Sequence, residues 1–299
     1  MKKEIKYIIW FVIVLLSINF VGQKVLLYGI NKFYGLKQYS KLLIVDASKL
    51  MLAINKQQLE DGTDLLVSKY TREGVTVSDK YYMLEQVFNT KYVDSIQIVL
   101  YGVDQFTFSN ERTSENAYKL FYPFMDDPVM DNYVKENASD WRDYYSHKLF
   151  PLSRYTDALI NASIRGWRND YSNKKDGVID IEKYRERSRT GRQIYMQPYL
   201  VDIFEKSMQI ITDKNIRVIL ISSPIVDVLN DFYQEERDSV IRYFEEYAEN
   251  NDLIEYWNLI PEYSSNYSIF YDPIHLNPQG QEIVTREIIS RINKLKKND

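Results

Sequence analysis

The sequence predicts a three-layer α/β domain built on a parallel sheet, preceded by one membrane-spanning helix. Short apolar runs that resemble buried strands recur along the chain, and amphipathic helical patterns lie between them. Strands that alternate with helices favour a parallel sheet covered on both faces. The membrane helix is indicated by a long apolar run within the first 30 residues. We therefore expect residues 1–30 to form an anchor and residues 31–299 to form one α/β domain.

The anchor is predicted from the run between Tyr7 and about Gln23. This run just meets the roughly 20 residues that a spanning helix needs. Three lysines, the last of them Lys6, precede it, so the positive-inside rule places the N-terminus in the cytoplasm and the rest of the chain outside. A cleaved signal peptide needs small residues after the apolar core, and residues 17–23 match that poorly. We favour an uncleaved anchor over a cleaved signal peptide and over a buried helix.

Four strands are expected in the body of the chain, each as a short apolar run. They lie at residues 42–45, 96–101 and 217–222, with a weaker one at 253–257. Apolar stripes at helical spacing predict helices over residues 200–211, 240–248 and 284–295. Ligands of such sheets bind at the carboxyl ends of the strands. The candidate functional residues are therefore those that directly follow a strand.

Residues 105–197 interrupt this alternation and are rich in polar and aromatic residues. We expect a largely helical insertion, or cap, over the strand ends. Its tyrosine and tryptophan rings would suit stacking on a sugar polymer. The alternative, which we favour, is that amphipathic rings fill the seam between the cap and the sheet.

The composition excludes several classes of function. The net charge of the 299 residues is −4, which argues against a nucleic-acid partner because such binding needs clustered Lys and Arg. The absence of cysteine excludes disulfide scaffolds, thiolate metal sites and cysteine nucleophiles. No glycine-rich phosphate-binding or dinucleotide-binding loop is present. We expect no metal and no cofactor.

The two histidines, His147 and His275, limit any histidine-dependent chemistry to few candidates. Asp272 lies three positions before His275, in a proline-containing loop that precedes the last expected helix. A carboxylate there can accept the Nδ1–H of the imidazole and leave Nε2 as a general base. His147 has no partner at helical or zinc spacing, so we expect it to be a surface or cap residue.

Ser48 is the candidate nucleophile, because it follows the first expected strand at a strand-to-helix turn. Backbone N–H groups at the start of a helix can stabilise an oxyanion. A serine at this position is also a common helix N-cap, so its place in the sequence alone leaves both roles open.

Together, in this order, the two motifs resemble those of the SGNH (GDSL-like) hydrolases and acyltransferases. The segment Asp-Pro-Ile-His-Leu-Asn-Pro-Gln-Gly at residues 272–280 closely matches the terminal motif of that family, and it includes Asn277. Residues 219–224 resemble its penultimate strand and Pro turn. The resemblance covers about residues 41–104 and 200–295. It implies a flavodoxin-like fold and a catalytic triad of Ser48, His275 and Asp272.

The chain departs from the family at two motifs. The family has Gly-Asp-Ser or Gly-Ser-Ser where this chain has Asp46-Ala47-Ser48. Its Gly-x-Asn block corresponds to Gly102-Val103-Asp104, and a carboxylate cannot donate as an amide does. Asp104 either points elsewhere, orients the cap or marks reduced activity. Lys49 either binds an anionic substrate or is a solvated first-turn residue, and we prefer the second interpretation.

The resemblance implies an acyl-transfer enzyme in which Lys49, Gly102, Asp104 and Asn277 are weaker candidates for oxyanion or substrate binding. The anchor favours transfer of an acetyl or other acyl group to or from a hydroxyl of a cell-envelope or exopolysaccharide. The expected partners are an acyl donor, a glycan acceptor and, by resemblance only, a membrane-bound O-acyltransferase. A secreted carbohydrate esterase or deacetylase is one alternative, and a non-catalytic envelope binding protein with this fold is another.

Overall fold

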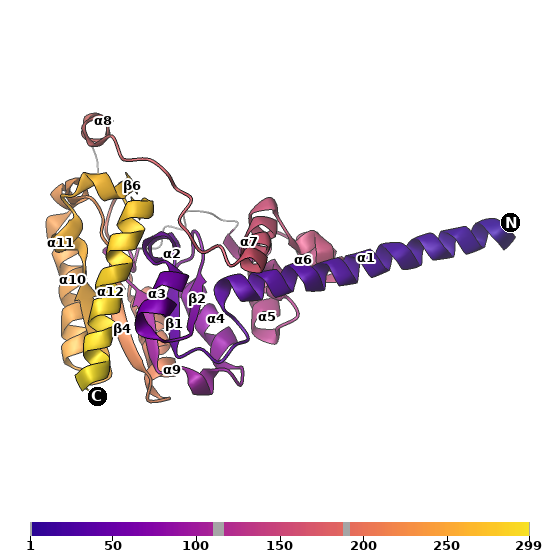
Figure 1. The fold of residues 1–299 in the computed structure, drawn as a ribbon, viewed down its shortest axis with the longest axis horizontal. Coiled ribbons are helices and arrows are strands. Elements are labelled where there is room, and N and C mark those ends of the chain that lie inside the picture. Colours follow the sequence, from indigo (N-terminus) through magenta and orange to yellow (C-terminus); the bar gives the residue numbers. More distant parts are fainter. Residues whose placement is uncertain (1, 110–116, 188–191, 299) are drawn as a thin grey trace. The chain divides into compact units, whose positions relative to one another are not determined.

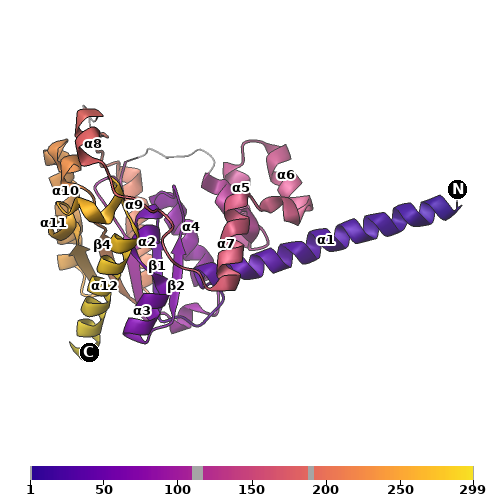
Figure 2. The same ribbon diagram turned by 45° about the horizontal axis from the view of Figure 1, so that its top comes forward.

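The computed structural model describes residues 2–109, 117–187 and 192–298, and the chain divides into two compact units (Figures 1 and 2). The helical unit consists of Met1–Leu36 and Glu115–Asp170, and the sheet unit consists of Lys37–Ser114 and Tyr171–Asp299. The central part of the expected 105–197 insertion thus groups with the expected anchor, while both ends of the insertion belong to the sheet unit. Residues 110–116 and 188–191 of that insertion lie outside the described residues.

The sheet unit is built on five parallel strands in the order β2-β1-β3-β4-β5, which is the order of flavodoxin-like folds. A two-stranded antiparallel ribbon, β6 and β7, stands apart from this sheet. The strands are β1 (Leu42–Asp46), β2 (Val67–Thr71), β3 (Ile98–Gly102), β4 (Arg217–Ser222), β5 (Ile254–Asn258), β6 (Phe270–Asp272) and β7 (His275–Leu276). The predicted α/β class with a parallel sheet is confirmed.

Helices cover both faces of the sheet. On one face, Ile44 and Ile219 share an apolar core with Ile288 of α12, and α3 packs beside α12. On the other face, α4 packs against α9, and Tyr101 of β3 meets Phe204 of α9 with ring centroids 5.9 Å apart. The α-helices of this unit are α2 (Ser48–Ala53), α3 (Lys56–Thr63), α4 (Val77–Phe88), α8 (Ile181–Arg187), α9 (Pro198–Thr212), α10 (Gln234–Glu249), α11 (Ile260–Tyr263) and α12 (Pro278–Asn298). Its 3₁₀ helices are η1 (Val93–Ser95), η4 (Asp227–Asp231) and η5 (Tyr267–Ile269).

Strand β2 is the one strand of the main sheet that the sequence did not predict. All five of its residues are buried, yet its sequence, Val-Ser-Lys-Tyr-Thr, is not an apolar run. The ammonium of Lys69 is buried because it donates hydrogen bonds to the carbonyl oxygens of Met51, at 2.7 Å, and of Ile54. These bonds at the end of α2 offset the cost of burying the charge.

The helical unit contains α1, a helix from Lys2 to Tyr34, and several shorter elements. Among the described residues, α1 is the one helix long and apolar enough to cross a membrane. Its side chains from Lys3 to Ile18 are exposed, whereas Ile30 is fully buried. The other elements are η2 (Ala117–Phe124), α5 (Pro128–Asn137), α6 (Trp141–Leu149), η3 (Pro151–Arg154) and α7 (Asp157–Arg168).

Two glycines bring α1 and α7 together. A Cβ atom added to Gly166 would lie 1.9 Å from the carbonyl oxygen of Gly29, and one added to Gly29 would lie 2.3 Å from the Oγ of Ser163. Neither approach leaves room for a side chain, so the helices meet backbone to backbone at this point. The C-terminal part of α1 is therefore an integral part of the helical unit.

Aromatic rings form the core of the helical unit. Tyr118, Phe121, Tyr122 and Tyr133 are almost completely buried, and the hydroxyls of Tyr118 and Tyr122 donate to Asp143 at 2.6 and 2.8 Å. His147 stacks on Tyr122 with centroids 4.1 Å apart, and its Nδ1 lies 2.9 Å from the Oγ of Ser153. These contacts place His147 among the residues that hold the insertion together.

Candidate active site

Three residues far apart in the sequence meet at the carboxyl end of β1. The Oγ of Ser48 lies 2.7 Å from the Nε2 of His275, and the Nδ1 of His275 lies 2.8 Å from the Oδ2 of Asp272. Both distances are within hydrogen-bond reach, so the hydroxyl, imidazole and carboxylate form one connected chain. This is the arrangement in which a histidine can take a proton from a serine while a carboxylate fixes its tautomer.

The loop between β6 and β7 holds Asp272 in place. Its Oδ1 accepts hydrogen bonds from the backbone N–H groups of Ile274, at 3.0 Å, and His275, at 2.9 Å, which leaves Oδ2 directed at the imidazole. Burial acts to raise the pKa of Asp272, but the hydrogen bonds from His275 and from these N–H groups outweigh it. The pKa of Asp272 therefore lies below its ordinary value of 3.8, and the carboxylate is ionised at neutral pH.

The turn that carries Ser48 is held by Asp46, the last residue of β1. The Oδ2 of Asp46 accepts the backbone N–H of Leu50 at 3.0 Å, and its Oδ1 lies 2.8 Å from the ammonium of Lys80. Both side chains of this ion pair are 7 % exposed. Asp46 thus binds the first turn of α2, and the departure from the family's glycine has a structural role in this chain.

Lys80 joins the carboxyl ends of two neighbouring strands. Besides Asp46 at the end of β1, its ammonium donates to the carbonyl oxygen of Gly102 at the end of β3, at 2.7 Å. Burial acts to lower the pKa of Lys80, but Asp46, together with Tyr101 and Asp104, outweighs it, so this pKa lies above its ordinary value of 10.5. Lys80 is therefore charged and fixed beside the turn of Ser48.

Gly102 makes room for this ion pair. A Cβ atom at Gly102 would lie 2.1 Å from the Cγ of Asp46, which no side chain can tolerate. The structure therefore gives Gly102 a packing role, and its carbonyl oxygen accepts from Lys80. Asp104, two residues later in the same motif, forms its ion pair with Lys49 instead of Lys80.

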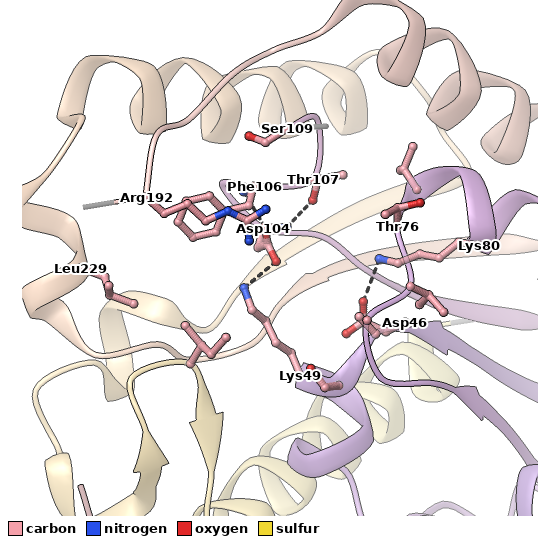
Figure 3. Close-up of a pocket in the computed structure, with 16 residues that line it drawn as sticks. Asp46, Lys49, Thr76, Lys80, Asp104, Phe106, Thr107, Ser109, Arg192 and Leu229 are labelled. Atoms are coloured by element: carbon pink, nitrogen blue, oxygen red, sulfur yellow. Dashed lines mark hydrogen bonds and ion pairs between the residues drawn. The ribbon is translucent and has the colours of Figure 1, made fainter. Parts of the chain in front are cut away.

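The preferred interpretation of Lys49 as a solvated residue was wrong. Its ammonium lies 2.5 Å from the Oδ2 of Asp104, and the two side chains are only 11 % and 22 % exposed. Figure 3 shows Lys49 reaching across the pocket towards Asp104. Burial acts to raise the pKa of Asp104, but Lys49, with smaller contributions from Lys80 and the backbone N–H of Phe106, outweighs it, so the pKa lies below 3.8 and the pair is ionic.

Of the three interpretations offered for Asp104, the structure shows that it points elsewhere. Its Oδ1 accepts the backbone N–H of Phe106, and its own N–H donates to the Oγ1 of Thr107 at 2.7 Å. The carboxylate is thus tied to Lys49 and to its own loop. It does not supply the amide donor that the Gly-x-Asn block provides in the SGNH family.

Asn277 stabilises the loop that carries His275 through hydrogen bonds to backbone groups. Its Nδ2 donates to the carbonyl oxygens of Gly177, at 3.0 Å, and Ser268, at 2.8 Å, while its Oδ1 accepts from the N–H of Gly280 at the start of α12. Asn277 is 4 % exposed. Both amide protons are engaged, so the structure places Asn277 in the support of the loop and not among the residues that line the pocket.

Ser48 is one of the residues that line a pocket of about 230 Å³. Figure 3 shows this pocket. Its apolar wall is formed by Val75, Val77, Phe106, Leu229 and Ile274. Its polar wall carries the two ion pairs already described, together with residues that include Thr76, Thr107, Ser109 and Arg192. The guanidinium of Arg192 lies over the ring of Phe106, 4.9 Å from its centroid. A small, mainly apolar group with one polar end fits this space.

Sequence reasoning missed two of the residues that shape this pocket. Lys80 occupies a buried position of α4 in line with Val77, Leu84 and Val87, at offsets of 3, 4 and 7 residues. A lysine inside an apolar helical stripe is a signal of a buried ion pair, so this residue was accessible to prediction. Arg192 lies in an irregular segment and offered no comparable signal.

Comparison of the chain with protein-family models and with curated proteins gives no match. The likeness to the SGNH family therefore rests on the order of the motifs around Ser48 and His275.

Proposed function

We propose that this chain is a membrane-anchored, SGNH-like enzyme that transfers acyl groups by way of Ser48. The observation that carries the proposal is the continuous hydrogen-bonded chain from the Oγ of Ser48 through His275 to Asp272, with both links at 2.7–2.8 Å. Nucleophilic catalysis by serine needs a base within hydrogen-bond reach and a third group that orients the base. Ser48, the first of these three residues, also lines a mainly apolar pocket.

In the first half of the reaction, the Oγ of Ser48 attacks the carbonyl carbon of an acyl ester or thioester. The hydroxyl proton passes to the Nε2 of His275, and Asp272 stabilises the imidazolium through Nδ1–H. The resulting tetrahedral intermediate collapses, the bond to the leaving group breaks, and His275 gives its proton to the leaving oxygen or sulfur. The acyl group is then bound to Ser48 as an ester.

In the second half, a hydroxyl group attacks the acyl–Ser48 ester and gives its proton to His275. Ser48 leaves as the alkoxide and takes that proton back, so the enzyme returns to its starting state. The negative oxygen of each tetrahedral intermediate needs N–H donors. The backbone N–H groups of Ser48 and Lys49 lie in the first turn of α2, where a helix has no acceptor of its own for them.

The pocket favours a short acyl group. Its volume of about 230 Å³ is smaller than the roughly 300–1,000 Å³ of sites that hold drug-sized ligands. An acetyl group or another short acyl chain would contact Val75, Val77 and Ile274 while its carbonyl faces Ser48. The acceptor hydroxyl would approach past the polar residues of the lining, which include Arg192.

Helix α1 supports a membrane location for this proposed chemistry. The helix is long and apolar enough to span a bilayer, and its basic N-terminus favours a cytoplasmic start with the site on the outer side. Polysaccharides of the cell envelope present hydroxyl groups on that side. We therefore propose O-acyl transfer to such a polymer, with an acyl donor that a membrane-bound O-acyltransferase would supply.

The test is turnover of p-nitrophenyl acetate by the full chain in detergent, with burst kinetics and with a soluble glycan as added acceptor. Ser48→Ala and His275→Ala should each abolish turnover. Ser239→Ala, at an exposed serine of α10, and His147→Gln, at the other histidine of the chain, are the matched controls and should retain it.

Turnover that survives in both Ser48→Ala and His275→Ala would contradict the proposed site. Acetylated glycan among the products supports transfer, whereas free acetate alone would indicate a carbohydrate esterase. Complete inertness of the wild-type chain towards a range of acyl donors would favour a non-catalytic binding protein.

A further inference from the structure

Helix α6 of the helical unit exposes an apolar stripe. Trp141, Tyr145 and Leu149 follow one another at intervals of four residues, so they lie on one face of the helix. Their exposed fractions are 68 %, 50 % and 65 %, and Phe150 directly after the helix is 56 % exposed. Single exposed apolar side chains are common on protein surfaces, but four large ones grouped together form a patch that needs an explanation.

The residues that flank this stripe on α6 fix its orientation. Tyr144 beside it is buried, and its hydroxyl donates to Asp131 of α5 at 2.9 Å. Lys148 lies 2.7 Å from the same carboxylate and also donates to the carbonyl oxygen of Met125. These contacts prevent α6 from rolling to bury the stripe inside its own unit.

The chain that follows α6 joins it directly to α1. The N–H of Leu152 in η3 donates to the Oδ1 of Asn19 at 2.9 Å, and the Leu152 side chain packs beside Gly22. A little further on, the hydroxyl of Tyr155 donates to the carbonyl oxygen of Gln23 at 3.1 Å. In Figures 1 and 2, α6 is the helix of the insertion nearest to the N-terminal part of α1.

These contacts set the depth of α6 along α1. Gln23 lies 16 residues after Tyr7, which is about 24 Å at the rise of an α-helix. The hydrocarbon layer of a bilayer is about 30 Å thick. If that layer begins at Tyr7, Asn19 lies about 18 Å and Gln23 about 24 Å into it, so both contacts are in the half that ends near Lys24.

We infer that the exposed face of α6, with Trp141, Tyr145, Leu149 and Phe150, lies in the interfacial layer of the bilayer that α1 crosses. The inference rests on the membrane-spanning role proposed for α1. Tryptophan and tyrosine favour the interface because their rings have an apolar body and a polar atom. The guanidinium of Arg142, 5.4 Å above the Trp141 ring, can meet the lipid phosphates beside it.

The function of this contact is to hold the helical unit against the membrane surface at a second point. A single spanning helix leaves a domain free to rotate about it and to tilt. A second contact through an amphipathic helix removes much of that freedom. The bilayer, and not another protein, is therefore the partner that this face fits.

The absence of cysteine makes a direct test possible, because a single introduced cysteine takes a nitroxide label without competition. The full chain with Leu149→Cys is reconstituted into vesicles of phosphatidylcholine and phosphatidylglycerol. Accessibility of the label is measured towards oxygen, which concentrates in lipid, and towards a water-soluble nickel complex. Glu136→Cys, at an exposed position of α5 in the same unit, is the aqueous control, and Leu15→Cys in α1 is the control for the anchor.

The expected result is a several-fold higher ratio of oxygen to nickel accessibility at Leu149→Cys than at Glu136→Cys. A label at residue 149 as accessible to nickel as that at residue 136, with residue 15 in lipid, would overturn this inference and leave the anchor intact. Nickel access at residue 15 as well would overturn the anchor and the inference together. A label at residue 149 shielded from both reagents would show that protein covers this face and would also overturn the inference.

Discussion

The ion pair of Asp46 and Lys80 gives a sharp prediction, because it links the fold to the position of Ser48. Lys80→Met keeps most of the side-chain volume but removes the charge that lies 2.8 Å from Asp46. The carboxylate, 7 % exposed, is then buried without its cation, and the carbonyl oxygen of Gly102 loses a donor. Removing one partner of a buried ion pair costs about 3–5 kcal/mol.

That loss should be visible in the melting temperature. The sheet unit has roughly 200 residues, and at that size 1 kcal/mol shifts Tm by about 2–4 °C. Lys80→Met should therefore lower Tm by roughly 6–20 °C. The double variant Asp46→Asn/Lys80→Met removes both charges, so its loss should be smaller than the sum of the two single losses.

The assay is thermal unfolding of the full chain in detergent, followed by near-ultraviolet circular dichroism. Lys214→Met, at an exposed lysine of the sheet unit, is the matched control and should leave Tm unchanged. A shift of less than about 2 °C for Lys80→Met, or strict additivity in the double variant, would refute the reasoning.

Three further predictions concern the same strand ends. Gly102→Ala places a Cβ atom 2.1 Å from the Cγ of Asp46, so urea unfolding should show a loss of about 1–3 kcal/mol, and a wild-type midpoint would contradict the packing role. Lys49→Met removes the cation that holds the pKa of Asp104 below 3.8. The stability from that low pKa is present above pH 3.8 and is lost as pH falls through the folded pKa, so the acid-unfolding midpoint of Lys49→Met should move to higher pH, and an unchanged midpoint would count against the pair. Asp272→Asn should lower the turnover of p-nitrophenyl acetate by about 10³- to 10⁴-fold because the imidazole loses its orienting carboxylate, and a loss below tenfold would exclude the triad.

The central sheet was predictable because its strands are buried on both faces. Such strands appear as continuous apolar runs, and four of the five were found to within a few residues. Strand β2 was not predicted because Lys69 interrupts its apolar character. The sheet tolerates this residue because its ammonium donates to backbone carbonyl oxygens at the end of α2. Contacts of that kind depend on the tertiary fold and leave no local pattern.

The candidate site also has a part that the sequence predicts and a part that it does not. The order of Ser48 and the Asp272–His275 motif predicts that a strand end and the last loop meet, and the structure places the two side chains 2.7 Å apart. The surroundings of the site were less accessible. Lys49 was expected in solvent because a first-turn lysine usually is, and its burial depends on Asp104, which follows a different strand.

The association of the insertion with α1 could not be read from the sequence. The signals for it are single glycines, at positions 29 and 166, which have many other uses in helices. Only the three-dimensional contact shows that both are needed at one crossing. The unit boundaries therefore differ from those that composition suggested.

The most direct test of the account is to locate the nucleophile chemically. The full chain is treated with a fluorophosphonate, digested and analysed by mass spectrometry. The Asp272→Asn variant is treated and analysed in the same way as a second sample. We predict one phosphonyl adduct, on the peptide that contains Ser48, and a much slower rate of labelling in the variant. An adduct on a different serine, or no adduct while a known serine esterase added to the same sample is labelled, would contradict the central claim that Ser48 is an activated nucleophile.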